Sequence, residues 1–107
     1  AGALTGVNII RSGPISSPNN TLTFAEANCP GGQFPVGGGV WTSSTKVGNQ
    51  SINSSWPTRQ NTTDPEPDAW GAWVNNTNGG TQTFNVYAIC ASGSVNASFL
   101  NDFARRP

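Results

Sequence analysis

Three consecutive glycines, Gly37 to Gly39, stand in the middle of a stretch that otherwise has the composition of a β-strand. The stretch follows the turn sequence Cys29-Pro30-Gly31-Gly32 and ends in Val40-Trp41. Glycine has no side chain to pack and weakens a strand interior, so three in a row predict that another group lies close to the backbone. We expect a large aromatic ring or a neighbouring strand to rest directly on these glycines.

Aromatic residues have to supply much of the core, because leucine is scarce and methionine is absent. The chain of 107 residues contains four tryptophans, five phenylalanines and one tyrosine, which is enough for one domain with a modest core. We therefore assign Trp41 and Trp56 to the core. The domain spans residues 1–107, with its core in about 7–91 and a C-terminal tail in 92–107.

The two cysteines, Cys29 and Cys90, accompany the two stretches with the clearest strand character. A bond between them would close a loop of about 60 residues and remove roughly 4 kcal/mol of freedom from the unfolded chain. Disulfides of this kind are typical of small domains in oxidising compartments. The sequence predicts a Cys29–Cys90 disulfide and a secreted, extracellular protein, with two buried free thiols as the alternative.

Short strand-like runs separated by turn residues predict an all-β fold, a small antiparallel β-sandwich or barrel. The expected strands cover 6–11, 21–29, the glycine-rich stretch up to Trp41, 51–56, 69–75 and 84–91. Pro57 is expected to end the fourth of them, and residues 16–20 are expected to form a loop. Asn78-Gly79 is a strong signal for a hairpin turn between the last two strands.

The strand expected over residues 84–91 is apolar on both sides in its second half. Ala88 and Cys90 lie on one face, and Tyr87 and Ile89 lie on the other. Such a strand is usually central in a sheet, or covered by a partner on its outer face. Tyr87 and Ile89 are therefore candidates for self-association.

The C-terminal segment has a different pattern, because its apolar residues follow helical spacing. We expect a short helix or an extended tail. Phe99, Leu100 and Phe103 are too apolar to remain in water and need a cover, either within the chain or from a second copy. They join the candidates for self-association.

Composition excludes several classes of function. The absence of histidine removes the usual general base and metal ligand, so we expect no enzyme, no catalytic residue and no cofactor. Five basic and five acidic residues leave no basic patch for nucleic acid, and no apolar run is long enough to span a membrane. Asp64, Glu66 and Asp68 are a weak calcium candidate, against the simpler interpretation of an exposed acidic loop.

Trp70 and Trp73 are three residues apart, so on one strand they point to opposite faces and cannot both lie in the core. One of them is then exposed or covered by another chain. Indole faces stack on sugar rings, and the neighbouring Asn75 and Asn76 offer hydrogen bonds. These four residues are the candidate site for a glycan.

The ordered motifs of the chain resemble those of a recurrent β-domain of secreted bacterial proteins, which commonly stands at the end of secreted or collagen-like chains. The motifs are Cys29-Pro30-x-Gly32, Gly37-Gly38-Gly39, Ser55-x-Pro57, Trp73, Asn75 or Asn76, and Val86-Tyr87-Ala88-Ile89-Cys90-Ala91. The likeness covers about Val7 to Ala91 and implies a disulfide between the two cysteine motifs, but no activity. Gln33-Phe34-Pro35 departs from the family pattern, and the tail lies outside it.

Two functions are compatible with these observations. The first is a structural or adhesive module that self-associates into an oligomer or fibre, through strand edges and apolar patches. The near-zero net charge permits such contact between copies. The alternative is a carbohydrate-binding, lectin-like module on a cell-surface glycan.

Overall fold

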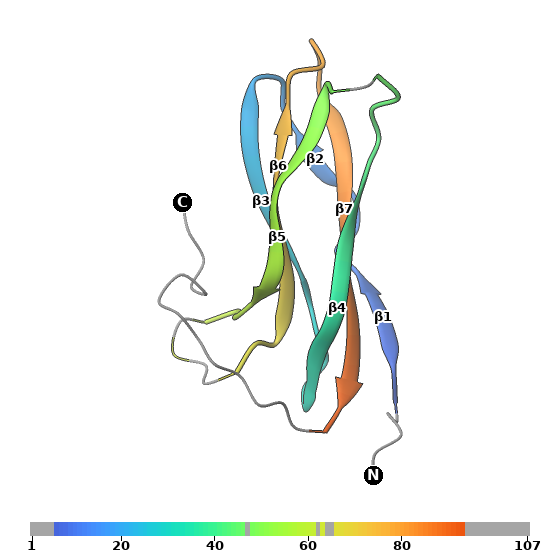
Figure 1. Ribbon diagram of the computed structural model, residues 1–107, viewed down its shortest axis with the longest axis vertical. Coiled ribbons are helices and arrows are strands. Elements are labelled where there is room, and N and C mark those ends of the chain that lie inside the picture. Colours follow the sequence, from blue (N-terminus) through green and yellow to red (C-terminus); the bar gives the residue numbers. More distant parts are fainter. Residues whose placement is uncertain (1–5, 47, 62, 64–65, 94–107) are drawn as a thin grey trace.

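The computed structural model of the protein describes residues 6–46, 48–61, 63 and 66–93 (Figure 1). This part of the chain is all-β, and no helix occurs in it. The expected tail or short helix lies outside the described residues. The strands are β1 (Asn8–Arg11), β2 (Ile15–Ser17), β3 (Thr21–Asn28), β4 (Gln33–Thr42), β5 (Gln50–Thr58), β6 (Ala69–Asn76) and β7 (Gln82–Ser92).

The strands form two antiparallel sheets that pack against each other as a sandwich (Figure 1). In the first, here the β7 sheet, β7 is central, with β4 on one side and β1 and β2 in succession on the other. In the second, the β6 sheet, β6 lies between β3 and β5. The central position of β7 agrees with its two-sided apolar pattern.

The core lies between the sheets and follows the period-two alternation of the strands. Phe84, Val86, Ala88 and Cys90 all point inward from β7 and are fully buried. Opposite them lie mostly small residues, from β3, from β6 and from the position just after β3: Ala25, Ala27, Cys29, Ala72 and Val74. Such small side chains let the sheets approach closely, and the ring of Trp70 packs against this cluster.

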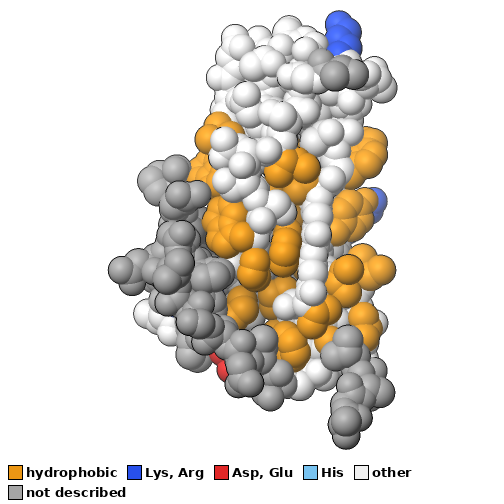
Figure 2. All heavy atoms as spheres, in the orientation of Figure 1, with side chains coloured by type: hydrophobic (Ala, Val, Ile, Leu, Met, Phe, Trp, Pro, Cys, Tyr) orange, Lys and Arg blue, Asp and Glu red, His pale blue; other side chains and the backbone are white. Residues whose placement is uncertain are grey.

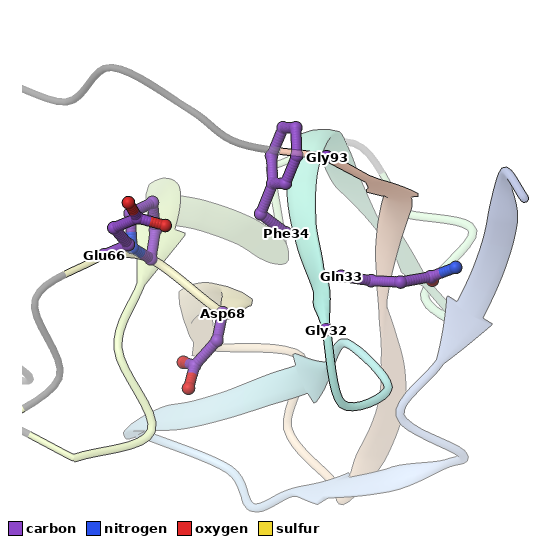
Figure 3. A pocket seen from close by; sticks show the side chains of 7 residues that line it. Gly32, Gln33, Phe34, Glu66, Asp68 and Gly93 are labelled. Atoms are coloured by element: carbon purple, nitrogen blue, oxygen red, sulfur yellow. The ribbon is translucent and has the colours of Figure 1, made fainter. Parts of the chain in front are cut away.

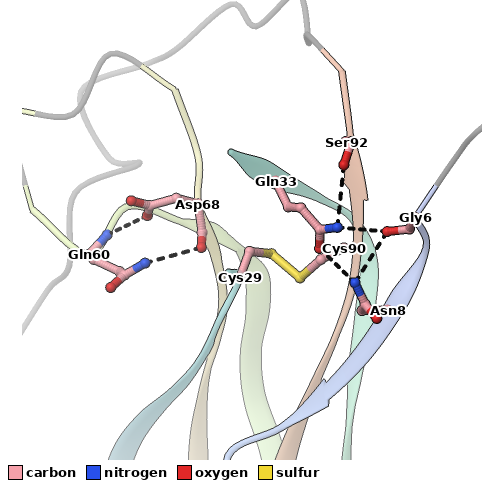
Figure 4. The surroundings of a disulfide bond; sticks show 8 residues. All are labelled: Gly6, Asn8, Cys29, Gln33, Gln60, Asp68, Cys90 and Ser92. Atoms are coloured by element: carbon pink, nitrogen blue, oxygen red, sulfur yellow. Dashed lines mark hydrogen bonds between the residues drawn. A yellow bond between two sulfur atoms is a disulfide. The ribbon is translucent and has the colours of Figure 1, made fainter. Parts of the chain in front are cut away.

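The predicted disulfide between Cys29 and Cys90 is confirmed and joins the two sheets, with a Cα–Cα distance of 5.7 Å (Figure 4). Polar side chains tie the start of the chain to the same end of the sandwich. Gln33 Nε2 donates to the carbonyl of Gly6 at 2.6 Å, and Asn8 Nδ2 donates to Gln33 Oε1 at 3.2 Å. The bridge therefore closes an end at which β1, β4 and β7 are already linked.

The expectation that Pro57 ends a strand is wrong, because β5 continues to Thr58. Since β5 is an edge strand, a proline there need not remove a ladder hydrogen bond. The register also shifts between Ile52 and Ser54. This bulge places Ile52 opposite Val74 of the inner face, whereas Trp56 lies opposite Gly71 on the outer face.

Two segments that were expected to be a loop and a hairpin turn have other structures. Ser16 and Ser17, which were expected to be in a loop, belong to strand β2, because Ile15 pairs with Phe84 and packs against the core. The segment after Asn76 is not a hairpin, since β6 and β7 belong to different sheets. Asn76 is fully buried there, and its Nδ2 donates to the carbonyls of Ser17 at 2.6 Å and Gly80 at 2.9 Å. The turn residues thus serve a crossover between the sheets.

Candidate interaction surface

The triple glycine allows an aromatic ring to lie directly on β4, which is one of the two alternatives that the sequence predicted. Gly38 faces the inside of the sandwich, and a Cβ atom there would overlap the ring of Trp70. The indole Nε1 of Trp70 donates to Ser55 Oγ at 2.7 Å, which fixes the ring in this position. Only glycine at position 38 admits the ring so close to the backbone.

The outer face of the β7 sheet is built from rows of cross-strand partners, because paired residues in antiparallel strands share a face. One row holds Ile9, Ile89 and Gly37. The next row holds Arg11, Tyr87 and Gly39, and the third holds Asn85 and Trp41. Each row runs from β1 or β7 across to β4.

Large apolar side chains are exposed in these rows. Ile9 is 70% exposed, Trp41 is 53% exposed and Ile89 is 37% exposed. The assignment of Trp41 to the core is therefore wrong. The period-two rule explains the error: Trp41 is three residues from Gly38, so a ring on the inner side of Gly38 requires Trp41 to point outward, but the sequence alone does not say which of the three glycines faces inward. Nothing in the sequence singled out Ile9.

Between the exposed side chains of Val36 and Trp41, the β4 part of this outer face carries no side chain at Gly37 and Gly39, whereas β1 and β7 carry projecting side chains beside them. A Cβ atom on Gly39 would meet nothing within 4 Å, and one on Gly37 would meet only Ile89 Cδ1 at 3.7 Å. Figure 2 shows a narrow strip of backbone where β4 runs in Figure 1, with hydrophobic side chains on its β1 side, which is the outer face. The outer face thus combines a ridge of isoleucines with a hollow above two glycines.

The outer face of the β6 sheet carries an aromatic cluster instead. The ring centroid of Phe24 lies 5.2 Å from that of Trp73 and 6.0 Å from that of Trp56. Trp56 is therefore not a core residue either. Phe24 also covers Gly71, where a Cβ atom would approach the phenyl ring to 3.0 Å.

The four residues of the candidate glycan site are divided between two faces. Trp70 packs against the core and Asn76 is buried, with its amide fully used by the crossover. Trp73 and Asn75 share the outer face of the β6 sheet. The parity argument for Trp70 and Trp73 thus holds, while Phe24 of the same chain partly covers the outward ring.

The other candidates are located as follows. Tyr87 and Ile89 lie side by side in the rows of the outer β7 face, whereas Phe99, Leu100 and Phe103 lie outside the described residues. Glu66 and Asp68 line a pocket of about 300 Å³ together with Phe34 (Figure 3). Asp68 Oδ1 accepts a hydrogen bond from the backbone N–H of Gln60 at 2.8 Å.

The calcium candidate gains no support from this arrangement. Asp64 lies outside the described residues, and no group of three acidic, histidine or cysteine residues with metal-binding geometry occurs in the part of the chain that the structure covers. That part also contains no helix long and apolar enough to cross a membrane. Comparison of the chain with models of protein families, with curated proteins and with solved structures finds no match.

Proposed function

We propose that the protein is a non-catalytic extracellular module that self-associates, as a structural or adhesive component, through the outer face of the β7 sheet. The observation that carries the proposal is the exposure of Ile9, Ile89 and Trp41 on one sheet face, in the first and third of three successive rows with Tyr87 in the row between. Fully burying one such side chain stabilises a contact by about 1.5–3 kcal/mol. Contiguous apolar patches of this kind mark interaction sites on soluble proteins.

A second copy of the chain is the partner that the charges favour. The chain has five basic and five acidic residues, so copies do not repel each other through a net charge. Arg11 is the one charged residue in the three rows described above. Few ionic groups would therefore lose their hydration in the contact.

The face is a better site for association than the edges formed by β4, by β5 and by β1 with β2. β4 carries Pro35 and a register shift between Pro35 and Gly37, and β5 carries Pro57 and a shift of its own. Prolines and bulges are the features by which natural edge strands avoid pairing with other chains. The edge of the β7 sheet opposite β4 is divided into two short strands, β1 and β2.

The particle mass in solution tests the proposal, for instance by sedimentation equilibrium over a range of concentrations. We expect the wild type to be an oligomer and Ile89→Lys to be a monomer. Leu22→Lys is the matched control, because Leu22 is 44% exposed, close to the 37% of Ile89, but lies on the other sheet. A wild-type monomer at every concentration, or equal effects of the two lysines, would contradict the proposal.

Carbohydrate binding is a second candidate, supported by the cluster of Phe24, Trp56 and Trp73 on the outer face of the β6 sheet. Asn75 lies on the same face and offers an amide to a sugar hydroxyl. A glycan array probed with the wild type and with Trp73→Ala tests it. Binding that is lost in the variant favours this function, and an array without any binding of the wild type rejects it.

A further inference from the structure

We infer that two copies pair about a two-fold axis parallel to β7, so that Ile9 of each copy packs into the hollow above Gly37 of the other; this inference rests on the proposed self-association. The juxtaposition that carries it is the row Ile9–Ile89–Gly37, which has a projecting side chain at one end and none at the other. The interface would be isologous, with the same residues used by both copies.

The position of β7 makes the row self-complementary. Neighbouring strands lie roughly 4.8 Å apart, so β1 and β4 stand at equal distances on either side of β7. A two-fold axis along β7 exchanges these two sides. It places β1 of one copy over β4 of the other, and Ile89 against Ile89.

The sizes of the groups agree with this pairing. Ile9 is 70% exposed and is the most exposed large apolar side chain among the described residues. The outer side of Gly37 is open, since a Cβ atom there would touch only Ile89 Cδ1, at 3.7 Å. On the inner side of the same strand, Trp70 already rests on Gly38, so the β4 backbone accepts a large apolar group at close range.

The second row fits the same axis. It places Arg11 of one copy over Gly39 of the other, where a side chain at position 39 would meet nothing within 4 Å. Trp41, two residues along the same face of β4, is 53% exposed. The guanidinium group of Arg11 can then lie on this indole, a favourable cation–π contact.

A two-fold axis across the strands, in the plane of the contact, gives a poorer fit. It would place β1 over β1 and β4 over β4. If this axis passes through the row of Arg11, Tyr87 and Gly39, Trp41 of each copy would lie over Gly37 of the other, but Arg11 of each copy would meet Arg11 of the other. Two like charges would then be set against each other, and Ile9, the most exposed large apolar side chain among the described residues, would not reach the hollow above Gly37. The axis parallel to β7 is therefore the better solution.

Moving the large side chain from position 9 to position 37 tests the pairing. The variants are Gly37→Val, Ile9→Ala and the double variant, in which the pair carries as many side-chain carbon atoms as in the wild type. Gly37 does not have a positive φ, and the Cβ contact at 3.7 Å is an ordinary one, so the valine is compatible with the folded monomer. We expect each single variant to raise the dissociation constant at least tenfold and the double variant to return it to within about threefold of the wild type.

The recovery of affinity in the double variant has to come from a contact between two chains. Positions 9 and 37 lie on opposite sides of β7, two strand spacings or roughly 9–10 Å apart, so their side chains do not replace each other within one chain. Gly31→Val is the control, because Gly31 also has open space around its Cβ position but lies in the turn before β4. Its dissociation constant should equal that of the wild type.

Cross-linking gives a second readout, on the proteins Ile9→Cys and Gly37→Cys. The native cysteines are buried in their disulfide. With dissolved oxygen as the oxidant, we expect an interchain disulfide when the two proteins are mixed and none in either protein alone. If the wild type associates but the double variant is as weak as the weaker single variant, and the mixture does not cross-link, the pairing geometry is wrong while self-association stands. If the wild type does not associate, the proposed function fails and the pairing with it.

Discussion

Gly38→Ala should be one of the most damaging single-methyl substitutions in this protein. The added Cβ atom would overlap the ring of Trp70, which lies on the glycine from the inside of the sandwich. Backbone strain plays no part, because Gly38 does not have a positive φ. The whole effect should come from the lost space between β4 and the ring.

The size of the effect follows from what the ring must give up. Overpacking a well-packed core costs about 1–3 kcal/mol. If the ring moves away, its hydrogen bond to Ser55 is lost as well, which adds about 0.5–1.5 kcal/mol. We therefore expect Gly38→Ala to lower the free energy of unfolding by about 2–4 kcal/mol, a large part of the ~5–15 kcal/mol typical of a domain.

Urea unfolding measures this loss of unfolding free energy on four proteins: the wild type, Gly38→Ala, Trp70→Leu and the double variant. All are studied at one low protein concentration, so that association contributes equally little. In the Trp70→Leu background the methyl group has room, and its cost should fall below about 1 kcal/mol, which gives a strong coupling in the double-mutant cycle. Gly39→Ala, with nothing within 4 Å of its Cβ position, is the control and should be neutral. Equal costs of Gly38→Ala in both backgrounds would refute the argument.

Three further substitutions address other contacts. Replacing Cys29 and Cys90 by alanine should lower the free energy of unfolding by about 2–5 kcal/mol in chemical denaturation; a loss below 1 kcal/mol would mean that the bridge is dispensable. Asn76→Ala removes donors to two backbone carbonyls at a fully buried position and should cost about 2–4 kcal/mol, with a shift of several degrees in the thermal midpoint. Thr58→Val removes the hydroxyl that donates to Glu26 Oε2 at 2.6 Å and should cost about 1.5–3 kcal/mol; an unchanged thermal midpoint would show that this hydrogen bond contributes nothing.

The main features of the fold could be read from local patterns. Alternation in 84–91 identified a central strand, and the four inward residues are those that the sandwich buries. The glycine run predicted an aromatic ring or a neighbouring strand on the backbone, and the ring of Trp70 lies there. These predictions succeeded because each depends only on the two-residue period of a strand and on the size of a side chain.

The wrong predictions concern features that depend on how distant strands pair with each other. The bulge near Asn53 moves Trp56 to the outer face, and no local signal marks it. The Asn78-Gly79 turn has hairpin chemistry, yet the flanking strands find better partners in different sheets. The exposure of Trp41 depended on which of the three glycines faces inward. That is a question of register, and the sequence leaves register open.

The central place of β7 also has a consequence for the order of events during synthesis. β1, β2 and β4 all take their backbone partners from β7, the last strand in the described part of the chain, so none of the three can pair before residues 82–92 are being made. By contrast, β3, β5 and β6 can assemble before that point. Pairings between the two ends of a chain form slowly, and unpaired strands are prone to wrong association in the meantime. A ribosome-bound chain that stops before β7 should therefore contain the β6 sheet together with β1, β2 and β4 as unpaired segments. The disulfide can close only after Cys90, which lies in β7, has left the ribosome.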